Sequence, residues 1–364
     1  RFFLVQSEEE GSVSVSESVG LSPEQRKGLE EAMARYVEEE KVAGLVTLVA
    51  RATGEPYVKA YGLRSRESGD AMRPDTLMRI ASLTKPITAT AIMMLVEEGR
   101  LALEDPVKRF IPSFGELKVE ADGRTKRLTR PMTVRHLLTH TSGLVYGLFS
   151  DTPIASQYRR RGLQRQRREE IVDTLSDLPL AFQPGTAWHY SVSYDVLAYL
   201  VDVIADRPFE DFIQERIFRP LGMADTGFVV PEMLVHRFAA FYTAPDDEGY
   251  QLIDAAEESS YLDPDRPKSG GGGLVSSASD YLRFMRMMLN GGALEGTRLL
   301  REETVERMTT NRLPEEMLPI RMGPRTMHGV GYGLGFGVKV AEARNGQPPK
   351  GTYWWAGVTG AYAW

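Results

Sequence analysis

The segment from residue 79 to residue 99 reads RIASLTKPITATAIMMLVEEG, and it constrains the fold more than any other part of the chain. Between Ile87 and Val96 the apolar side chains cover every side of a helical wheel, which is typical of a helix buried on all faces. Lys85 lies at the mouth of this helix and is expected to enter the protein interior, with Ser82 three residues earlier on the same face. A buried ammonium group is costly, so Lys85 needs a partner or a function that uses its uncharged form.

Length and charge indicate a compact globular protein. With 364 residues and 42% hydrophobic content, the chain is long enough for a large core and for two closely packed subdomains. Its net charge of −6 gives no basic footprint, so nucleic acid is not an expected partner. The one basic cluster, YRRRGLQRQRR at 158–168, is interpreted as a solvated helical insertion.

Cysteine is absent, which excludes disulfides, thiolate catalysis and cysteine-ligated metals. No run of about eighteen apolar residues occurs, so no membrane partner is expected. The opening RFFLVQ is too short for the apolar region of a signal peptide, and a cytoplasmic location is therefore predicted. Residues 1–20 are rich in serine and acidic residues and are predicted to form a flexible lead-in. The oligomeric state cannot be read from the sequence.

The first elements are a helix and a β-hairpin. A helix is predicted within SPEQRKGLEEAMARYVEEE at 22–40, where Ser22 caps the helix and Gln25 completes a capping box. The next stretch, GLVTLVARATGEPYVKAYG at 44–62, predicts two strands joined by a turn at 53–56.

Sequence patterns typical of β-strands occur again near the other end of the chain, in HGVGYGLGFGVKV at 328–340 and GTYWWAGVTGAYAW at 351–364. Helical patterns dominate between the two β-rich regions. We therefore predict an α+β fold, an α/β sandwich with one antiparallel sheet formed by both ends of the chain. Residues 21–81 and 311–364 would form the sheet subdomain, and residues 82–310 an inserted, mainly helical subdomain.

Ser82 and Lys85 form a Ser-x-x-Lys pattern that can carry chemistry. Serine is a poor nucleophile until a base takes its proton, and a desolvated lysine can be that base. The pattern alone is weak, since roughly one copy is expected by chance in a chain of this length. A capping serine beside a lysine that extends to solvent would look the same. Two further features favour chemistry: Tyr190, at a turn before an apolar helix, and the tripeptide WAG at 355–357 in a β-rich segment.

The order Ser-x-x-Lys, Tyr-Ser-x and a strand motif ending in glycine resembles the serine β-lactamase and penicillin-binding protein superfamily. Four more segments resemble it: TVRHLLTHTSGL at 133–144, PGTAWHYS at 184–191, IFRPLGMADTGF at 217–228 and SGGGGLVSSASDYLRFMRMMLNGG at 269–292. The resemblance covers most of the chain from about residue 25 to residue 364. It implies a β-lactamase/transpeptidase-like fold.

Two departures from the superfamily pattern bear on the substrate. Class C β-lactamases carry asparagine as the third residue of the tyrosine motif, where this chain has Val192, and lysine or histidine where it has Trp355. Val192 cannot hydrogen-bond the side-chain amide of a β-lactam, and Trp355 cannot pair with a substrate carboxylate. The variant motifs look like those of the family VIII carboxylesterases, the esterase branch of this fold.

The resemblance implies a serine carboxylesterase that hydrolyses small, short-chain esters through an acyl-enzyme. Ser82 would be the nucleophile, and Lys85 and Tyr190 would share the base and acid roles. Backbone N–H groups of Ser82 and Val358 would form the oxyanion hole. Substrate contacts are expected from Tyr146, Trp188, Val192, Trp355 and Gly357. No metal or organic cofactor is required.

Other functions are open at this stage. The nearest are a class C-like β-lactamase, a D-Ala-D-Ala peptidase and an acyltransferase that uses the same acyl-enzyme. A non-enzymatic binding protein on this scaffold is disfavoured, because such proteins usually lose the nucleophile or the base, and Ser82 and Lys85 are both present.

Some patterns imitate other sites. The tripeptide KSG at 268–270 matches a β-lactamase strand motif, but more glycines and a helical pattern follow it, so it is interpreted as a flexible loop leading into a helix cap. His136 and His140 have metal-ligand spacing, but a leucine stands where a zinc protease has its glutamate. No Gly-x-Ser-x-Gly elbow occurs, which argues against an α/β-hydrolase triad. His189 is interpreted as a hydrogen-bonded neighbour of Tyr190.

Overall fold

The structure, a computed structural model, describes residues 19–121, 123–149, 151–245, 249–343 and 346–364. Nearly all of the lead-in predicted for residues 1–20 lies outside the described residues. Helix α2 spans Pro23–Glu38. The Ser22 side chain accepts the backbone N–H of Gln25, and the Gln25 side chain accepts that of Ser22, so the predicted capping box is confirmed.

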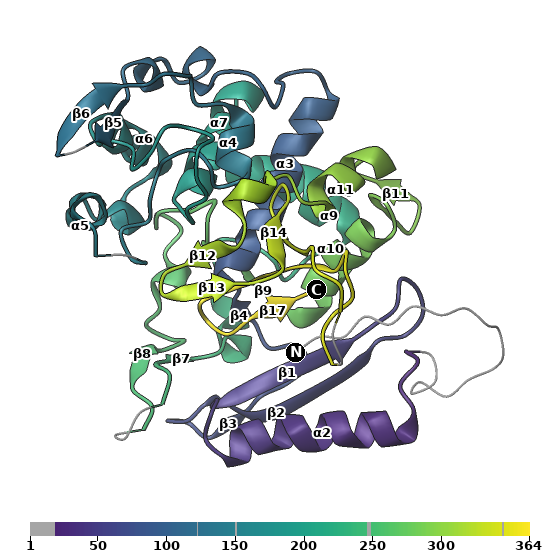
Figure 1. Ribbon diagram of the computed structural model, residues 1–364. Helices are drawn as coiled ribbons and strands as arrows, with labels where there is room; N and C mark the ends of the chain where they lie inside the picture. Colours follow the sequence, from purple (N-terminus) through teal and green to yellow (C-terminus); the bar gives the residue numbers. More distant parts are fainter. Residues whose placement is uncertain (1–18, 122, 150, 246–248, 344–345) are drawn as a thin grey trace.

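A three-stranded antiparallel sheet follows α2, and its strands are β1 (Gly44–Val49), β2 (Tyr57–Ser65) and β3 (Asp70–Ala71). The predicted hairpin is confirmed, because β1 and β2 pair along the whole length of β1. Successive side chains of a strand point to opposite faces of its sheet. Val49 packs with Val19 and Tyr57 on the α2 side, whereas Leu48 packs with Ala278 of α10 (Ala278–Leu289). The sheet is thus covered on both faces (Figure 1).

Helix α3 spans Thr84–Glu97, and every residue from 84 to 95 is buried. The prediction of a helix buried on all faces is therefore confirmed. The strand β4 (Met78–Arg79) and a turn of 3-10 helix at Ala81–Leu83 lead into α3. Helix α7 (Ser193–Ala205) packs against α3 and also against two neighbours, α4 (Val134–Leu138) and α6 (Arg168–Ser176).

The remaining helices are α5 (Pro153–Arg160), α8 (Phe209–Ile213), α9 (Arg219–Leu221) and α11 (Glu302–Thr309). Three short hairpins lie among them: β5 (Lys118–Ala121) with β6 (Arg124–Arg127), β7 (Phe241–Tyr242) with β8 (Leu252–Asp254), and β10 (Ala293–Leu294) with β11 (Thr297–Arg298). Of the helices in the described ranges, none has the length and apolar character needed to span a membrane.

The basic segment 158–168 joins α5 to α6 and is not fully solvated. The Arg168 guanidinium donates to both carboxylate oxygens of Asp202 and to Glu210, at 2.7 to 2.9 Å. The interpretation as a solvated insertion is therefore wrong for Arg168, because two carboxylates on neighbouring helices take up its charge in the interior.

The C-terminal sheet contains β14 (Val330–Tyr332), β15 (Gly337–Lys339), β16 (Tyr353–Ala356) and β17 (Tyr362–Ala363), paired antiparallel in chain order. A separate hairpin precedes it, formed by β12 (Ile320–Met322) and β13 (Arg325–Met327). The predicted α+β class is confirmed, but the prediction of one sheet from both ends needs correction. Among the described residues the N-terminal and C-terminal strands form separate ladders, because short connections pair each strand with its neighbour in sequence.

Candidate active site

Ser82 lies in the short link between β4 and α3. The strand β4 pairs with β9 (Val275–Ser276), which fixes the chain just before the serine. Ala81 has a φ of 44°, a left-handed conformation that costs a residue with a Cβ about 1–2 kcal/mol. Such strain persists only where the surroundings enforce it, and it clusters at functional sites. The Ser82 side chain follows this strained residue and is half-buried.

Lys85 is fully buried and contacts Ser82 from the first turn of α3. Its Nζ donates to Ser82 Oγ at 3.1 Å and to the Gly271 carbonyl oxygen at 2.6 Å. The same nitrogen lies 4.6 Å from the centre of the Tyr190 ring, which is a cation–π geometry. The alternative of a lysine that extends to solvent is therefore wrong, and the buried amine has a hydroxyl, a carbonyl and an aromatic face as partners.

Tyr190 approaches Ser82 from the segment just before α7. Its hydroxyl donates to Ser82 Oγ at 2.7 Å, and the Trp355 indole N–H donates to the Tyr190 hydroxyl oxygen at 3.4 Å. The Tyr190 ring also stacks on Tyr146 with centroids 5.6 Å apart. One serine hydroxyl thus contacts an amine and a phenol, which are two groups able to take and return its proton.

The WAG motif at 355–357 ends beside the same serine. Gly357 lies so close to the preceding segment that a Cβ there would be 2.6 Å from the Ile80 carbonyl oxygen. Thr359 Oγ1 donates to the Arg79 carbonyl at 2.7 Å. These two contacts flank Val358, whose side chain is 84% exposed, and they hold its backbone next to the start of the 3-10 turn.

We expect Gly357→Ala to lower kcat about tenfold or more, because the new methyl group pushes the end of β16 away from Ser82 and small displacements of this kind are costly in catalysis. The measurement is kcat for p-nitrophenyl acetate beside the thermal unfolding midpoint. Gly28→Ala is the matched control, since a Cβ at Gly28 meets nothing within 4 Å. Wild-type kcat in Gly357→Ala would show that this close approach has no bearing on the site.

Three of the predicted substrate-contact residues, Tyr146, Trp188 and Trp355, surround the Tyr190 ring. Val192 and Trp355 are each only 3% exposed, and Trp188 is 8% exposed, so these three side chains offer little surface to a ligand. Tyr146 is half-buried, and burial, with the nearby Asp195 carboxylate, raises the pKa of its hydroxyl well above the usual value. The rings of Tyr146, Trp188 and Trp355 pack against the Tyr190 ring.

The three histidines singled out from the sequence are engaged elsewhere. His189 Nδ1 pairs with the Tyr190 carbonyl oxygen at 2.9 Å, as a hydrogen-bonded neighbour would. In His136 and His140 the Nδ1 atom accepts a backbone N–H. Burial lowers the pKa of His136 to about 4 and lowers the pKa values of the other two as well. All three rings are therefore neutral near pH 7.

The sequence interpretation missed one element of the site, the loop at 268–273. Ser277 caps α10, so the expected helix cap after this loop is correct. The expected flexibility is wrong, because Gly270 and Gly271 are buried and a Cβ at Gly270 would lie 2.4 Å from Ala198 Cβ. The glycines allow the loop to pack against α7 with the Gly271 carbonyl on Lys85. A run of glycines directly before a buried strand is the signal that could have indicated this close packing.

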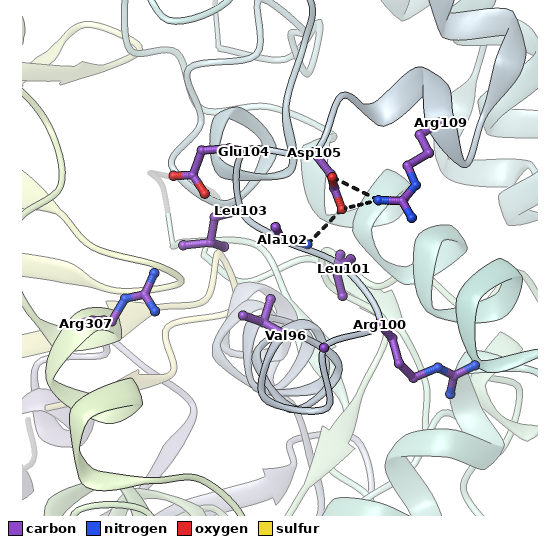
Figure 2. Close-up of a pocket in the computed structure, with 10 residues that line it drawn as sticks. Val96, Arg100, Leu101, Ala102, Leu103, Glu104, Asp105, Arg109 and Arg307 are labelled. Atoms are coloured by element: carbon purple, nitrogen blue, oxygen red, sulfur yellow. Dashed lines mark hydrogen bonds and ion pairs between the residues drawn. The ribbon is translucent and has the colours of Figure 1, made fainter.

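A surface hollow of about 420 Å³ lies at the other end of α3, beside Val96 and Arg100. Because α3 has 14 residues at about 1.5 Å each, the hollow is about 20 Å from Ser82 along the helix. Figure 2 shows that its Asp105 is already bonded to Arg109 and to the Ala102 N–H. The hollow is therefore separate from the Ser82 cluster.

A buried lysine and a tyrosine that share one serine hydroxyl, in an α+β frame with a helical insertion, mark the protein as a serine hydrolase. The family model described as Beta-lactamase matches residues 29–364. The chain therefore belongs to the Beta-lactamase family.

Individual relatives agree with this assignment. The chain is 35% identical over 356 residues to esterase EstB from Burkholderia gladioli, a match that covers 90% of this chain and 83% of EstB. Its structure is similar to that of EstCE1, described as a hydrolase with promiscuous acyltransferase activity, with a TM-score of 0.76 and 27% identity over 93% of this chain and 89% of EstCE1. It is also similar to a mutant of simvastatin synthase (LovD) from Aspergillus terreus, with a TM-score of 0.73 and 27% identity over 90% of this chain and 83% of LovD. The predicted β-lactamase/transpeptidase-like fold and the resemblance to family VIII esterases are thereby confirmed.

Proposed function

We propose that this protein is a carboxylesterase that hydrolyses small esters with short acyl chains through an acyl-enzyme on Ser82. One observation carries the proposal: Ser82 Oγ lies 3.1 Å from Lys85 Nζ and 2.7 Å from the Tyr190 hydroxyl. A half-buried serine hydroxyl with two proton-handling neighbours is arranged for nucleophilic catalysis. Lys85 and Tyr190 are the proposed base and acid.

Acylation begins when Ser82 Oγ attacks the carbonyl carbon of the ester. Neutral Lys85 accepts the hydroxyl proton, while one of its N–H bonds stays on the Gly271 carbonyl and turns the lone pair toward Ser82. The Ser82 and Val358 backbone N–H groups would stabilise the oxyanion of the tetrahedral intermediate. Tyr190 then gives a proton to the leaving alkoxide and takes the proton held by Lys85, so the C–O bond breaks and the alcohol departs.

Deacylation reverses these proton movements. Water attacks the acyl carbon of the Ser82 ester, and Lys85 and Tyr190 again take its proton and return one to Ser82 Oγ. The products are a carboxylic acid and the free serine.

Esters are favoured over β-lactams as substrates because two polar side chains that would bind a β-lactam are missing. Val192 cannot hydrogen-bond the side-chain amide of a β-lactam. Trp355 has no positive charge to pair with a substrate carboxylate, and its indole N–H donates to Tyr190. The names of the relatives point the same way, since EstB is an esterase and another relative, from Penicillium rubens and 30% identical over 343 residues, is a lovastatin esterase.

A second candidate is acyl transfer to an alcohol, which differs only in the group that attacks the acyl-enzyme. It is favoured by the similarity to EstCE1 and to LovD. Incubation of the enzyme with a p-nitrophenyl ester and a small alcohol distinguishes the two outcomes, because transfer forms a new ester that mass spectrometry detects.

We expect kcat/KM for p-nitrophenyl acetate to exceed that for a chromogenic cephalosporin by at least about 10³-fold, since recognition that depends on absent polar partners is lost by several powers of ten. A class C β-lactamase assayed in parallel is the control for the cephalosporin. Comparable values for the two substrates would contradict the esterase proposal and restore the β-lactamase interpretation.

A further inference from the structure

Asp195 is a buried carboxylate that the chemistry above leaves unused. It lies in the first turn of α7, where the helix dipole favours a negative charge, and only 4% of its surface is exposed. Burial raises the pKa of the Asp195 carboxyl group. A group that is costly to bury needs partners that justify its position.

These partners belong to the loop at 268–273. Asp195 Oδ1 accepts the hydroxyl of Ser269 at 2.6 Å and the backbone N–H of Gly271 at 3.3 Å. The Gly271 N–H also reaches Ser269 Oγ at 3.1 Å, so the two loop residues and the carboxylate form a closed triangle. On the other side of the same residue, the Gly271 carbonyl accepts Lys85 Nζ at 2.6 Å.

Contacts on either side of the triangle hold the rest of the loop. Thr88 Oγ1, one turn after Lys85 on α3, donates to the Gly270 carbonyl at 2.6 Å. Arg168, fixed by its two carboxylate partners, donates to the Lys268 carbonyl at 2.9 Å. Side chains of α3, α6 and α7 thus hold the loop. Among these contacts, that of Asp195 with the Gly271 N–H lies nearest to the Gly271 carbonyl, which accepts the Lys85 amine.

We propose that Asp195 is a positioning residue for Lys85, acting through Ser269 and Gly271, and this inference rests on the proposed role of Lys85 as the base. A lysine amine on a four-carbon stem has many orientations. The Gly271 carbonyl selects the one in which the lone pair meets the Ser82 proton, and Asp195 keeps that carbonyl in place. A displacement of about 1 Å at such a group can cost about 10²-fold in rate.

Charged and aromatic groups surround both Asp195 and Lys85. Asp195 faces Lys85 on α3, Arg168 on α6 and the Tyr146 hydroxyl. The neighbours of the Lys85 amine are Asp195, His140 and the rings of Tyr146, Tyr190 and Tyr194. Removal of the Asp195 charge therefore takes away both a charge near the Lys85 amine and the carboxylate that holds Ser269 and Gly271.

The test compares Ser269→Ala and Asp195→Asn with Ser176→Ala. This matched control removes a hydroxyl that bonds to Ser113 and to the Val172 carbonyl on α6. We expect Ser269→Ala to lower kcat for p-nitrophenyl acetate about tenfold or more with KM changed less than about threefold. Asp195→Asn is expected to lower kcat by a similar factor, again with KM changed less than about threefold. Ser176→Ala keeps the wild-type kcat and KM. If Asp195→Asn does not fold, Ser269→Ala decides the question.

Wild-type kcat in folded Ser269→Ala and Asp195→Asn, or a loss that lies in KM with kcat unchanged, would overturn the inference. Ser82→Ala and Lys85→Arg are assayed in the same series. If those two are inactive, only the positioning role of Asp195 fails. If Lys85→Arg hydrolyses esters at the wild-type rate, the proposed role of Lys85 fails, and the positioning role fails with it.

Discussion

Ser82→Ala is expected to lower kcat for p-nitrophenyl acetate by at least about 10⁴-fold, because loss of the nucleophile of a serine hydrolase removes most of its catalysis. The fold should be retained, since Ser82 is half-buried and its hydroxyl bonds to the site groups Lys85 and Tyr190. Far-UV circular dichroism and the thermal unfolding midpoint check the fold.

Ser176→Ala is the matched control for this substitution. Its hydroxyl bonds to Ser113 and to the Val172 carbonyl near the end of α6, away from the lysine and tyrosine. It should keep the wild-type kcat. A folded Ser82→Ala protein with full activity would end the acyl-enzyme proposal.

Lys85→Arg is expected to lower kcat/KM about 10³-fold, within the range that general acid–base groups contribute. A guanidinium group keeps its charge at every accessible pH, so it cannot accept the Ser82 proton. In the wild type the neutral amine of Lys85 can do so. The measurement is kcat/KM for both proteins, with folding checked by circular dichroism.

Lys59→Arg is the control for the change of lysine to arginine. Lys59 lies on β2 and forms an ion pair with Glu30 of α2 at 2.7 Å, which arginine would preserve. Tyr190→Phe completes the series by removing the other proton-handling group. Substantial activity in folded Lys85→Arg, together with an inactive Tyr190→Phe, would make Tyr190 the base and Lys85 a structural residue.

The local part of the site could be predicted from the sequence because it lies within one helical turn. Ser82 and Lys85 are three residues apart, and a helix brings such positions to one face whatever surrounds them. The apolar composition of residues 87–96 likewise predicts burial without knowledge of the partners. Tyr190 is 108 residues from Ser82. Its turn before an apolar helix drew attention to it, but its role beside Ser82 followed only from the resemblance to a known motif.

The carbonyl partner of Lys85 could not be predicted in this way. Gly271 is 186 residues from Lys85, and it contributes a backbone oxygen, which every residue type possesses. The side chain of a residue does not indicate that its backbone oxygen makes such a contact. Glycines in a row are equally compatible with a mobile linker and with close backbone packing, and only the positions of α3 and α7 decide between them.

Trp355 shows how much a strand motif predicts about one of its side chains. Its place in the strand motif indicated a position near Ser82, and a substrate contact was expected. In the structure its indole N–H is directed at Tyr190 and its ring is almost fully buried. Alternation along a strand predicts which side chains point inward, but not which neighbour each one meets.

Stoichiometric labelling with a p-nitrophenyl phosphonate ester, followed by intact-mass and peptide mass spectrometry, tests the central claim most directly. Such a probe phosphonylates an activated serine and releases p-nitrophenol, and the adduct resists hydrolysis. We predict one label per chain, located on Ser82, absent in Ser82→Ala and formed much more slowly in Lys85→Arg. A label on another residue would contradict the account. So would a wild-type protein that still hydrolyses esters after Ser82 has been labelled.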